Sequence, residues 1–261
     1  MGGFGCSKYS LISEAANEEI IQSITCAETK QQIRCCSRKY SGCWLLAASP
    51  FAITDAFSVA LQLRLGWTPR DAATTKVKCV GCNFHSSPKQ METHVLGCSH
   101  IHGVNVSTRH NALKIAMADL CRVNGLFVKL EPGMASSSRR ADLAITSGSA
   151  LHLVDLTIVN TKARSYQQKT MEEIEQRKEE IKRKLYGKDA DAMHAIFHVF
   201  HVDVLGGFSN PAAALSKWIA QQTGTELLDV IRRFATVTQR WNSMILLNHR
   251  ARLHLATLRG Q

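Results

Sequence analysis

One stretch of the sequence predicts a β-hairpin with one aspartate on each strand: Arg140-Ala141-Asp142-Leu143-Ala144-Ile145-Thr146-Ser147-Gly148-Ser149-Ala150-Leu151-His152-Leu153-Val154-Asp155-Leu156-Thr157. Gly148-Ser149 suits a two-residue type II′ turn, because glycine tolerates the positive φ that the first turn position needs. In that register Asp142 lies directly opposite Asp155, and the Cβ atoms of such pairs are about 4.5–5.5 Å apart.

The alternation of side chains along the hairpin divides them between two faces. The core-forming face is expected to hold Leu143, Ile145, Val154, Leu156 and Ile158, and the other face Asp142, Ala144, Leu153, Asp155 and Thr157. Two like charges opposite each other repel, and a divalent cation would turn that repulsion into a binding site. The alternative is a solvated hairpin end that carries two unrelated aspartates.

The whole chain is basic and rich in cysteine. It has 261 residues, of which 45% are hydrophobic, with a net charge of +11. A strong positive charge favours a polyanionic partner, and no apolar run is long enough to span a membrane. The nine cysteines are an odd number in a chain of this length. They therefore favour reduced thiols and a metal site over a disulfide framework.

Hydrophobic periodicity predicts a mixed α/β core. Helices are expected over 10–30, 54–66, 108–124, 167–186, 211–222 and 225–258, and strands over 126–131 and 195–204 in addition to the hairpin.

A zinc site is predicted upstream of the hairpin. Cys79-Val80-Gly81-Cys82 forms a two-residue knuckle, and His94 and Cys98 follow in the spacing Cys-x2-Cys-x11-His-x3-Cys. Four such ligands are typical of a structural Zn²⁺ site without an open position. His85, His100 and His102 are rival ligands, and incidental cysteines are the alternative interpretation.

The two aspartates gain further candidate partners from neighbouring segments. Asp142 and Asp155 would hold Mg²⁺ or Mn²⁺, and Glu131 is a candidate third carboxylate. Phosphodiester hydrolysis also needs a cation such as lysine near the reacting phosphate. Lys178 and Lys182 on the following helix are the candidates, although most charges there fit an exposed helix with i,i+4 pairs.

Basic residues near these segments are candidate nucleic-acid contacts. Arg109-His110-Asn111 lies at the expected start of a helix, where Arg and backbone donors suit a phosphate. A capped helix start with a satisfied histidine explains the same residues. Arg139 and Arg140 precede the hairpin and complete the candidate set.

In order, the chain presents Cys-x2-Cys, His-x3-Cys, Arg-His-Asn, Leu-Glu-Pro, Arg-Ala-Asp and Val-Asp-Leu-Thr-Ile-Val-Asn. This order resembles the C-terminal region of non-LTR retrotransposon proteins that carry a CCHC zinc motif and a restriction-like, PD-(D/E)xK-type endonuclease. The resemblance runs from about residue 41 to 207. It departs at Ala141, where the family usually has proline, and no reverse-transcriptase motif Tyr-x-Asp-Asp is present.

The resemblance implies roles for particular residues. Asp142 and Asp155 correspond to the family's metal-binding aspartates, and Cys79, Cys82, His94 and Cys98 to its zinc ligands. Lys182, a few residues before Tyr186, fits the family's lysine best, with Lys178 the alternate. The implied partners are DNA and, in addition, element RNA or a reverse transcriptase supplied in trans, in a nuclear, reducing location.

These expectations combine into one hypothesis. The fold is expected to be a small mixed sheet flanked by helices, of restriction-endonuclease-like type. A helical extension would occupy 1–70, the zinc motif 71–107, the endonuclease core 108–222 and a basic helical tail 223–261. The expected function is metal-dependent nicking of target DNA for target-primed reverse transcription. The alternatives are a nucleic-acid-binding remnant with a vestigial nuclease centre and an unrelated basic zinc protein.

Overall fold

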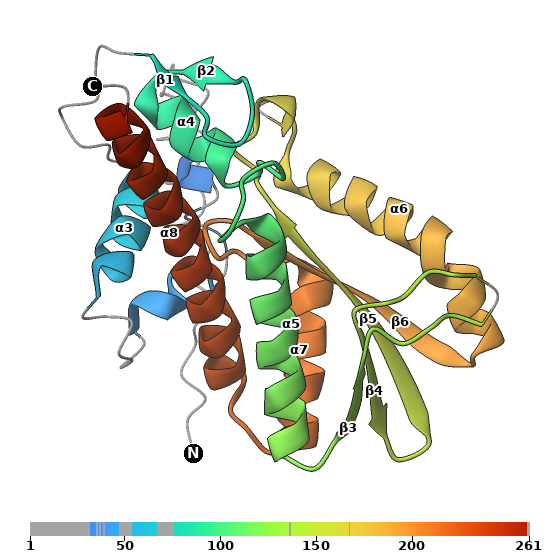
Figure 1. Cartoon of the computed structure of the whole chain (residues 1–261). Coiled ribbons are helices and arrows are strands. Elements are labelled where there is room, and N and C mark those ends of the chain that lie inside the picture. Colours follow the sequence, from blue (N-terminus) through green and yellow to red (C-terminus); the bar gives the residue numbers. More distant parts are fainter. Residues whose placement is uncertain are drawn as a thin grey trace.

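The computed structural model describes residues 32–34, 36, 38, 40–46, 54–66, 76–135, 137–166 and 168–259 (Figure 1). The helix predicted over 10–30 lies outside the described residues, as does most of the extension predicted over 1–70. The elements in chain order are the 3-10 helix η1 (Cys43–Leu46), α3 (Asp55–Leu65), β1 (Val77–Lys78), β2 (His85–Ser86), α4 (Pro88–Val95), α5 (Val106–Val123), β3 (Phe127–Leu130), β4 (Leu143–Ser147), β5 (Ala150–Val159), the 3-10 helix η4 (Arg164–Tyr166), α6 (Met171–Ala192), β6 (Ala195–Asp203), α7 (Asn210–Thr223) and α8 (Leu227–Arg259).

The central sheet is mixed, as the sequence predicts. Its strand order is β3-β4-β5-β6. The first three strands are antiparallel, and β6 pairs parallel to β5 after the chain has crossed through α6. A parallel pair requires such a crossover, because its two strands run in the same direction. The α/β class is therefore confirmed.

The β4–β5 hairpin has the predicted register. Ser147 pairs with Ala150 and Leu143 pairs with Val154. Gly148 adopts a φ of +58°, which the first position of a type II′ turn requires. The register places Asp142, immediately before β4, at the level of Asp155 on β5.

Helices cover both faces of the sheet. Leu143, Ile145, Val154 and Leu156 pack in one core with residues of α5, α7 and α8. On the opposite face, Ala144, Leu153, Phe197 and Val199 pack with Ala190 of α6. Figure 1 shows α6 on one side of the sheet and α5, α7 and α8 on the other. The face that carries the aspartates is thus largely buried under α6, which excludes a freely solvated hairpin.

Local capping sets the starts of the two helices that border the site. Asn105 caps α5 by accepting hydrogen bonds from the amides of Ser107 and Thr108, so the helix begins two residues earlier than predicted. Thr170 and Glu173 form a capping box at the start of α6. This exchange satisfies two backbone donors, and α6 extends beyond its predicted end to Ala192.

The zinc-motif segment and the last helix share a second core. Leu96 and Ile101 pack there with Val159 at the end of β5 and with Ile245 and Leu246 of α8. Other residues of α8 belong to the core beneath the sheet. The helix predicted over 225–258 is thus present as α8, and it packs into both cores.

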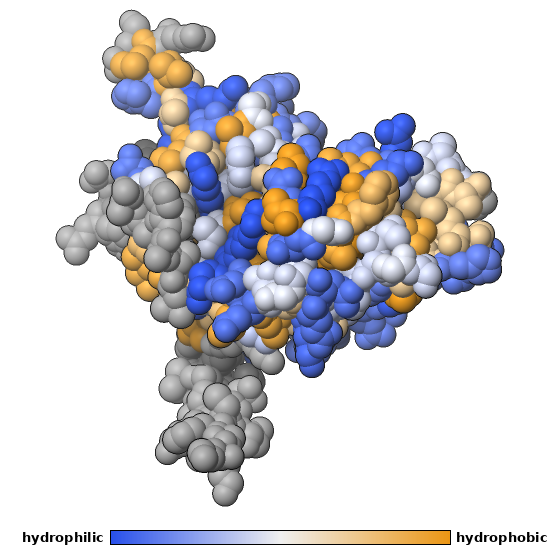
Figure 2. Space-filling view, turned by 90° about the horizontal axis from the view of Figure 1, so that it is seen from below, coloured by the Kyte–Doolittle hydropathy of each residue, from blue (hydrophilic) through white to orange (hydrophobic). Residues whose placement is uncertain are grey.

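No helix among the described residues is long and apolar enough to cross a bilayer. Seen from the end that carries the β4–β5 turn, hydrophilic and hydrophobic residues are interspersed over the described surface (Figure 2).

Candidate functional site

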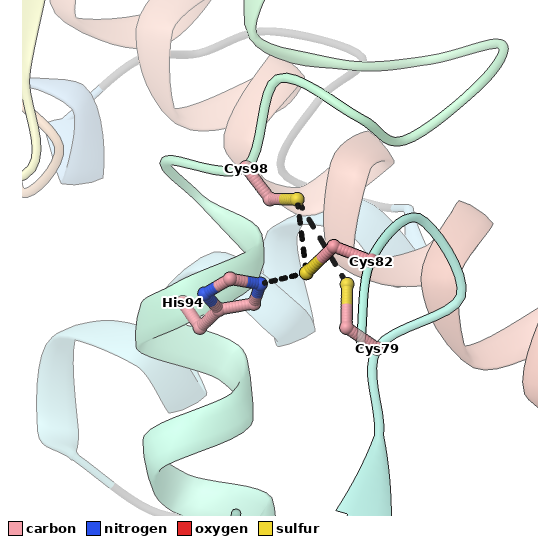
Figure 3. Close-up of side chains that lie close together, drawn as sticks. All are labelled: Cys79, Cys82, His94 and Cys98. Atoms are coloured by element: carbon pink, nitrogen blue, oxygen red, sulfur yellow. Dashed lines mark hydrogen bonds between the residues drawn. The ribbon is translucent and has the colours of Figure 1, made fainter. Parts of the chain in front are cut away.

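The predicted zinc ligands converge on one point (Figure 3). Cys79 and Cys82 flank the knuckle between β1 and β2, His94 lies in the last turn of α4, and Cys98 follows that helix. The Sγ atom of Cys98 is 3.9 Å from the Sγ atoms of both other cysteines. The Sγ atom of Cys82 is 3.2 Å from Nε2 of His94. All four ligand atoms lie within 4.8 Å of one another.

These distances fit a tetrahedral zinc ion. Zn–S bonds of about 2.3 Å and Zn–N bonds of about 2.0–2.1 Å give S···S edges of about 3.8 Å and S···N edges of about 3.6 Å. A disulfide would need about 2.05 Å between sulfurs, and all three cysteines are free thiols. The rival ligands His85, His100 and His102 are exposed and lie outside the cluster. The donor set therefore suits Zn²⁺, which these four residues would hold.

Neighbouring groups fix the shape of the zinc cluster. The amide of Gly81 points at the Sγ atom of Cys79 at 3.4 Å. A Cβ atom at Gly81 would stand 2.6 Å from the backbone of His100, so no other residue fits without movement. The ring of Phe84 stacks on His94 with centroids 4.3 Å apart. Burial lowers the pKa of His94 and so favours the neutral imidazole that metal binding requires.

Asp142 is held by the backbone and by a helix. Its Oδ2 atom accepts a hydrogen bond from the amide of Leu156 at 2.7 Å and lies 3.2 Å from Nε2 of His110 on α5. Burial alone would raise the pKa of Asp142, but the contacts with His110 and the Leu156 amide hold it below its ordinary value. The hydrogen bond between Asp142 and His110 also raises the pKa of His110. Asp142 is thus an ionised carboxylate in contact with a histidine that favours its protonated form.

Asp155 meets the lysine that the sequence favoured. Its side chain is only 5% exposed, and its Oδ2 atom is 2.7 Å from Nζ of Lys182 on α6. Burial raises the pKa of Asp155 above its ordinary value, although Lys182 opposes that shift. The Lys182 ammonium also lies 5.8 Å from the centre of the Tyr186 ring. Thus α6 brings the predicted lysine to the second aspartate.

The alternate lysine takes a different place. Nζ of Lys178 lies 5.9 Å from the centre of the Tyr166 ring. Lys178 still lines the same pocket as Lys182. Lys182 is therefore the candidate lysine that contacts Asp155.

Glu131 stands at the rim of the site. It follows β3 with a φ of +46°, and its amide donates to the backbone carbonyl of Asp142. Its carboxylate lies 2.6 Å from Nζ of Lys114 and 3.8 Å from Arg140. The hydrogen bond with Lys114 lowers the pKa of Glu131. Glu131 is therefore ionised and paired within the site.

An open pocket of about 600 Å³ is lined by most of these groups, while Asp155 lies behind Lys182 and is not among the lining residues. It lies between the N-terminal half of α5 and the middle of α6, over the aspartate end of the hairpin. The charged and titratable lining residues are Arg109, His110, Lys114, Glu131, Asp142, Lys178 and Lys182. Opposite charges thus line one hollow that is large enough for a phosphate group and its neighbours.

The predicted nucleic-acid contacts divide into two kinds. Arg109 is 2% exposed, and its guanidinium donates to Asn242 of α8 at 2.6 Å. This burial gives it a packing role, and because Arg109 also lines the open pocket, the phosphate contact stays a prediction. His110 contacts Asp142 and so belongs to the carboxylate site. Arg139 and Arg140 are exposed, and Arg139 bonds the backbone carbonyl of Leu185 on α6.

Sequence reasoning missed Lys114 and the Leu156 amide. Lys114 is four residues beyond His110, and residues with this spacing lie on the same face of a helix. That spacing would have placed Lys114 beside the aspartates. The Leu156 amide carries no signal in the sequence, because every residue but proline has one.

No protein-family model matches the chain, and no curated protein sequence matches it. The proposal of a function therefore depends on the residue motifs and on the geometry of the two sites.

Proposed function

We propose that the protein is a metal-dependent DNA endonuclease domain of retrotransposon origin, with a restriction-endonuclease-like core and a structural zinc site. The observation that carries this proposal is that Lys182, whose ammonium lies 2.7 Å from the carboxylate of Asp155, lines one open pocket together with Asp142. Asp142 immediately precedes β4, Asp155 lies on β5 and Lys182 lies on the crossover helix α6. The close approach of these three side chains supports a shared catalytic role, because the packing of the core requires no charged group at these positions.

The donor chemistry of the pocket fits Mg²⁺ or Mn²⁺. Asp142 and Asp155 offer hard carboxylate oxygens, which these ions prefer, and Mg²⁺ keeps several waters when one or two carboxylates bind it. The hydrogen bonds to Asp142 keep it ionised. When bound, the cation would polarise the phosphate and lower the pKa of an attacking water.

The surrounding residues have distinct tasks in such a reaction. Lys182 is positioned to stabilise negative charge that develops on the phosphate, because its ammonium already faces Asp155. Lys114 is buried at the pocket wall and offers a second positive charge. The Leu156 amide and His110 hold Asp142 in a fixed orientation, which lowers the cost of ordering the site during the reaction.

A second candidate is a zinc-containing nucleic-acid-binding protein derived from such an element, with a vestigial nuclease centre. One observation favours it: each aspartate already has a cationic or potentially cationic partner, Lys182 for Asp155 and His110 for Asp142. A site neutralised by its own side chains has less need of a metal ion. Cleavage activity separates the two candidates.

The test is nicking of supercoiled plasmid DNA in Mg²⁺ or Mn²⁺, compared between the wild type and Asp142→Ala. We expect the wild type to nick and Asp142→Ala to lose at least about 100-fold in rate, because charge stabilisation by one site group is worth that much. Asp191→Asn is the matched control, since Asp191 is exposed at the end of α6. Equal nicking rates for the wild type and Asp142→Ala would refute the catalytic role proposed for Asp142.

A further inference from the structure

A second hollow lies between the segment from β1 to Cys98, here called the zinc module, and the crossover helix α6. It lies beside the open pocket at Asp142, here called the carboxylate pocket. Its volume is about 750 Å³. Residues of α4, the end of β5, η4 and α6 line it. Thr157, Ile158 and Lys178 line both hollows, so the two adjoin each other along β5. Thr157 is only two residues beyond Asp155 on the same strand.

The charge of this second hollow is of one sign. Its charged lining residues, within the described chain, are Lys89, Lys162 and Lys178, and no carboxylate is among them. The pocket next to it holds Glu131 and Asp142 as well as basic residues. A groove with only positive charges attracts an anion, and a chain of phosphates would extend from it into the carboxylate pocket.

The lining of the hollow includes aromatic and apolar side chains. The ring of Tyr166 lines it, with the ammonium of Lys178 5.9 Å from the ring centre. Phe84, Ile158 and Val159 add apolar lining. Aromatic rings beside basic side chains are typical of sites that stack the bases of single strands and bind their phosphates.

Two polar atoms of the wall have unused hydrogen-bonding capacity. Thr157 Oγ1 and Asn160 Oδ1 have no hydrogen-bond partner among the described residues. The amide nitrogen of Asn160 donates to the backbone carbonyl of Thr93 on α4, which fixes the side chain at the junction of zinc module and sheet. Both atoms are buried, and buried polar atoms are normally satisfied, so an enclosed water molecule behind the groove surface is expected to bond them.

We propose that this groove binds an unpaired segment of the DNA strand, next to the phosphate that lies at Asp142 and Asp155. The inference rests on the proposed nuclease function and names its substrate class: DNA with an unpaired or splayed strand at the cleavage site. Pockets of about 300–1,000 Å³ take drug-sized ligands. A groove of this size therefore accepts a few nucleotides of one strand and excludes a duplex. The zinc module serves as one wall of the groove.

Binding measured without added Mg²⁺ tests the groove apart from cleavage. Fluorescence anisotropy would compare a labelled single-stranded oligonucleotide with the same sequence as a duplex. Loss of one stacked base in Tyr166→Ala should weaken single-strand affinity about tenfold, while duplex affinity stays unchanged. Tyr166→Phe keeps the ring and should bind as the wild type does.

Charge reversal provides a second test that does not disturb packing. Lys89 is exposed, so Lys89→Glu should fold normally and lower single-strand affinity, with a smaller salt dependence. Lys129→Glu, on the exposed edge strand β3, is the matched control and should have little effect. If Tyr166→Ala and Lys89→Glu leave the ratio of single-strand to duplex affinity unchanged, the groove proposal is overturned.

The outcomes separate this proposal from the nuclease proposal. A protein that never nicks DNA, yet loses single-strand binding in Tyr166→Ala, keeps the groove and refutes the nuclease. A protein that nicks duplex and splayed substrates at equal rates, with or without Tyr166, keeps the nuclease and refutes the groove.

Discussion

Removal of one zinc ligand should abolish a large, metal-dependent part of the stability. The best position is Cys82, because its side chain is partly exposed, whereas Cys79 and Cys98 are 2% and 5% exposed. Cys82→Ser therefore removes a thiolate with little loss of packing. A loss of the zinc-dependent rise in Tm in this variant then reports the loss of metal binding.

The magnitude follows from linkage between binding and folding. Free zinc at 1,000 times its dissociation constant stabilises the folded state by about 4.1 kcal/mol. For chains of about 150–250 residues each kcal/mol raises Tm by about 2–4 °C, so we expect a rise of about 8–16 °C. The zinc cluster packs with Leu96, Ile101 and α8 in one core, so loss of zinc should lower the stability of α8 as well as that of the zinc module.

The assay is thermal unfolding with buffered zinc and with a chelator, together with metal analysis of the purified protein. The wild type should contain about one equivalent of zinc, since structural sites bind the ion tightly. Cys82→Ser should lose the zinc-dependent rise in Tm, and Cys43→Ser, which lies outside the cluster, should keep it. A wild type with under about half an equivalent of zinc and no change in Tm on chelation would refute the reasoning.

Three further predictions concern the remaining contacts. Lys182→Met should slow nicking about 100-fold and leave the zinc content unchanged. Lys184 is exposed on the same helix, so Lys184→Met should nick at the wild-type rate. Equal losses of nicking rate in both variants would count against a role for Lys182. Gly81→Ala should destabilise the zinc module by about 1–3 kcal/mol, because the added Cβ would lie 2.6 Å from backbone atoms. The loss of stability is measured as faster loss of zinc to a chelator. Zinc retention equal to that of the wild type would contradict the close approach at Gly81. The contact with Asp142 raises the pKa of His110, so its stabilisation is present below the unfolded value of about 6.5 and is lost as pH rises through the folded pKa. Urea unfolding from pH 5 to 8 should therefore show a fall in stability that His110→Asn lacks, and identical pH profiles would argue against this pair.

The hairpin was predictable because its information is local. A two-residue turn at Gly148 and alternating side chains fix the register of β4 and β5, and the structure has that register. The cysteine and histidine spacing likewise identified four residues whose ligand atoms meet. The helix starts were less well placed, because the side-chain caps of Asn105 and Thr170 decide them.

The rest of the site depends on contacts between distant segments. The burial of Arg109 against Asn242 follows from the packing of α8 across α5, which no local pattern encodes. Lys182 and Lys178 are one helical turn apart, and only the placement of α6 on the sheet decides which one meets Asp155. The groove beside the zinc module arises where α4, the end of β5, η4 and α6 meet, so its lining could not be inferred from the sequence.

The most direct test of the nuclease centre is the product of plasmid cleavage by the wild type and by Asp155→Asn in Mg²⁺. We expect the wild type to leave nicks whose 3′ hydroxyl ends a DNA polymerase extends without further treatment, and Asp155→Asn to leave the plasmid supercoiled. Nicking that persists in Asp155→Asn, or a wild type that leaves the plasmid intact in both Mg²⁺ and Mn²⁺, would contradict a metal-dependent centre at Asp142 and Asp155.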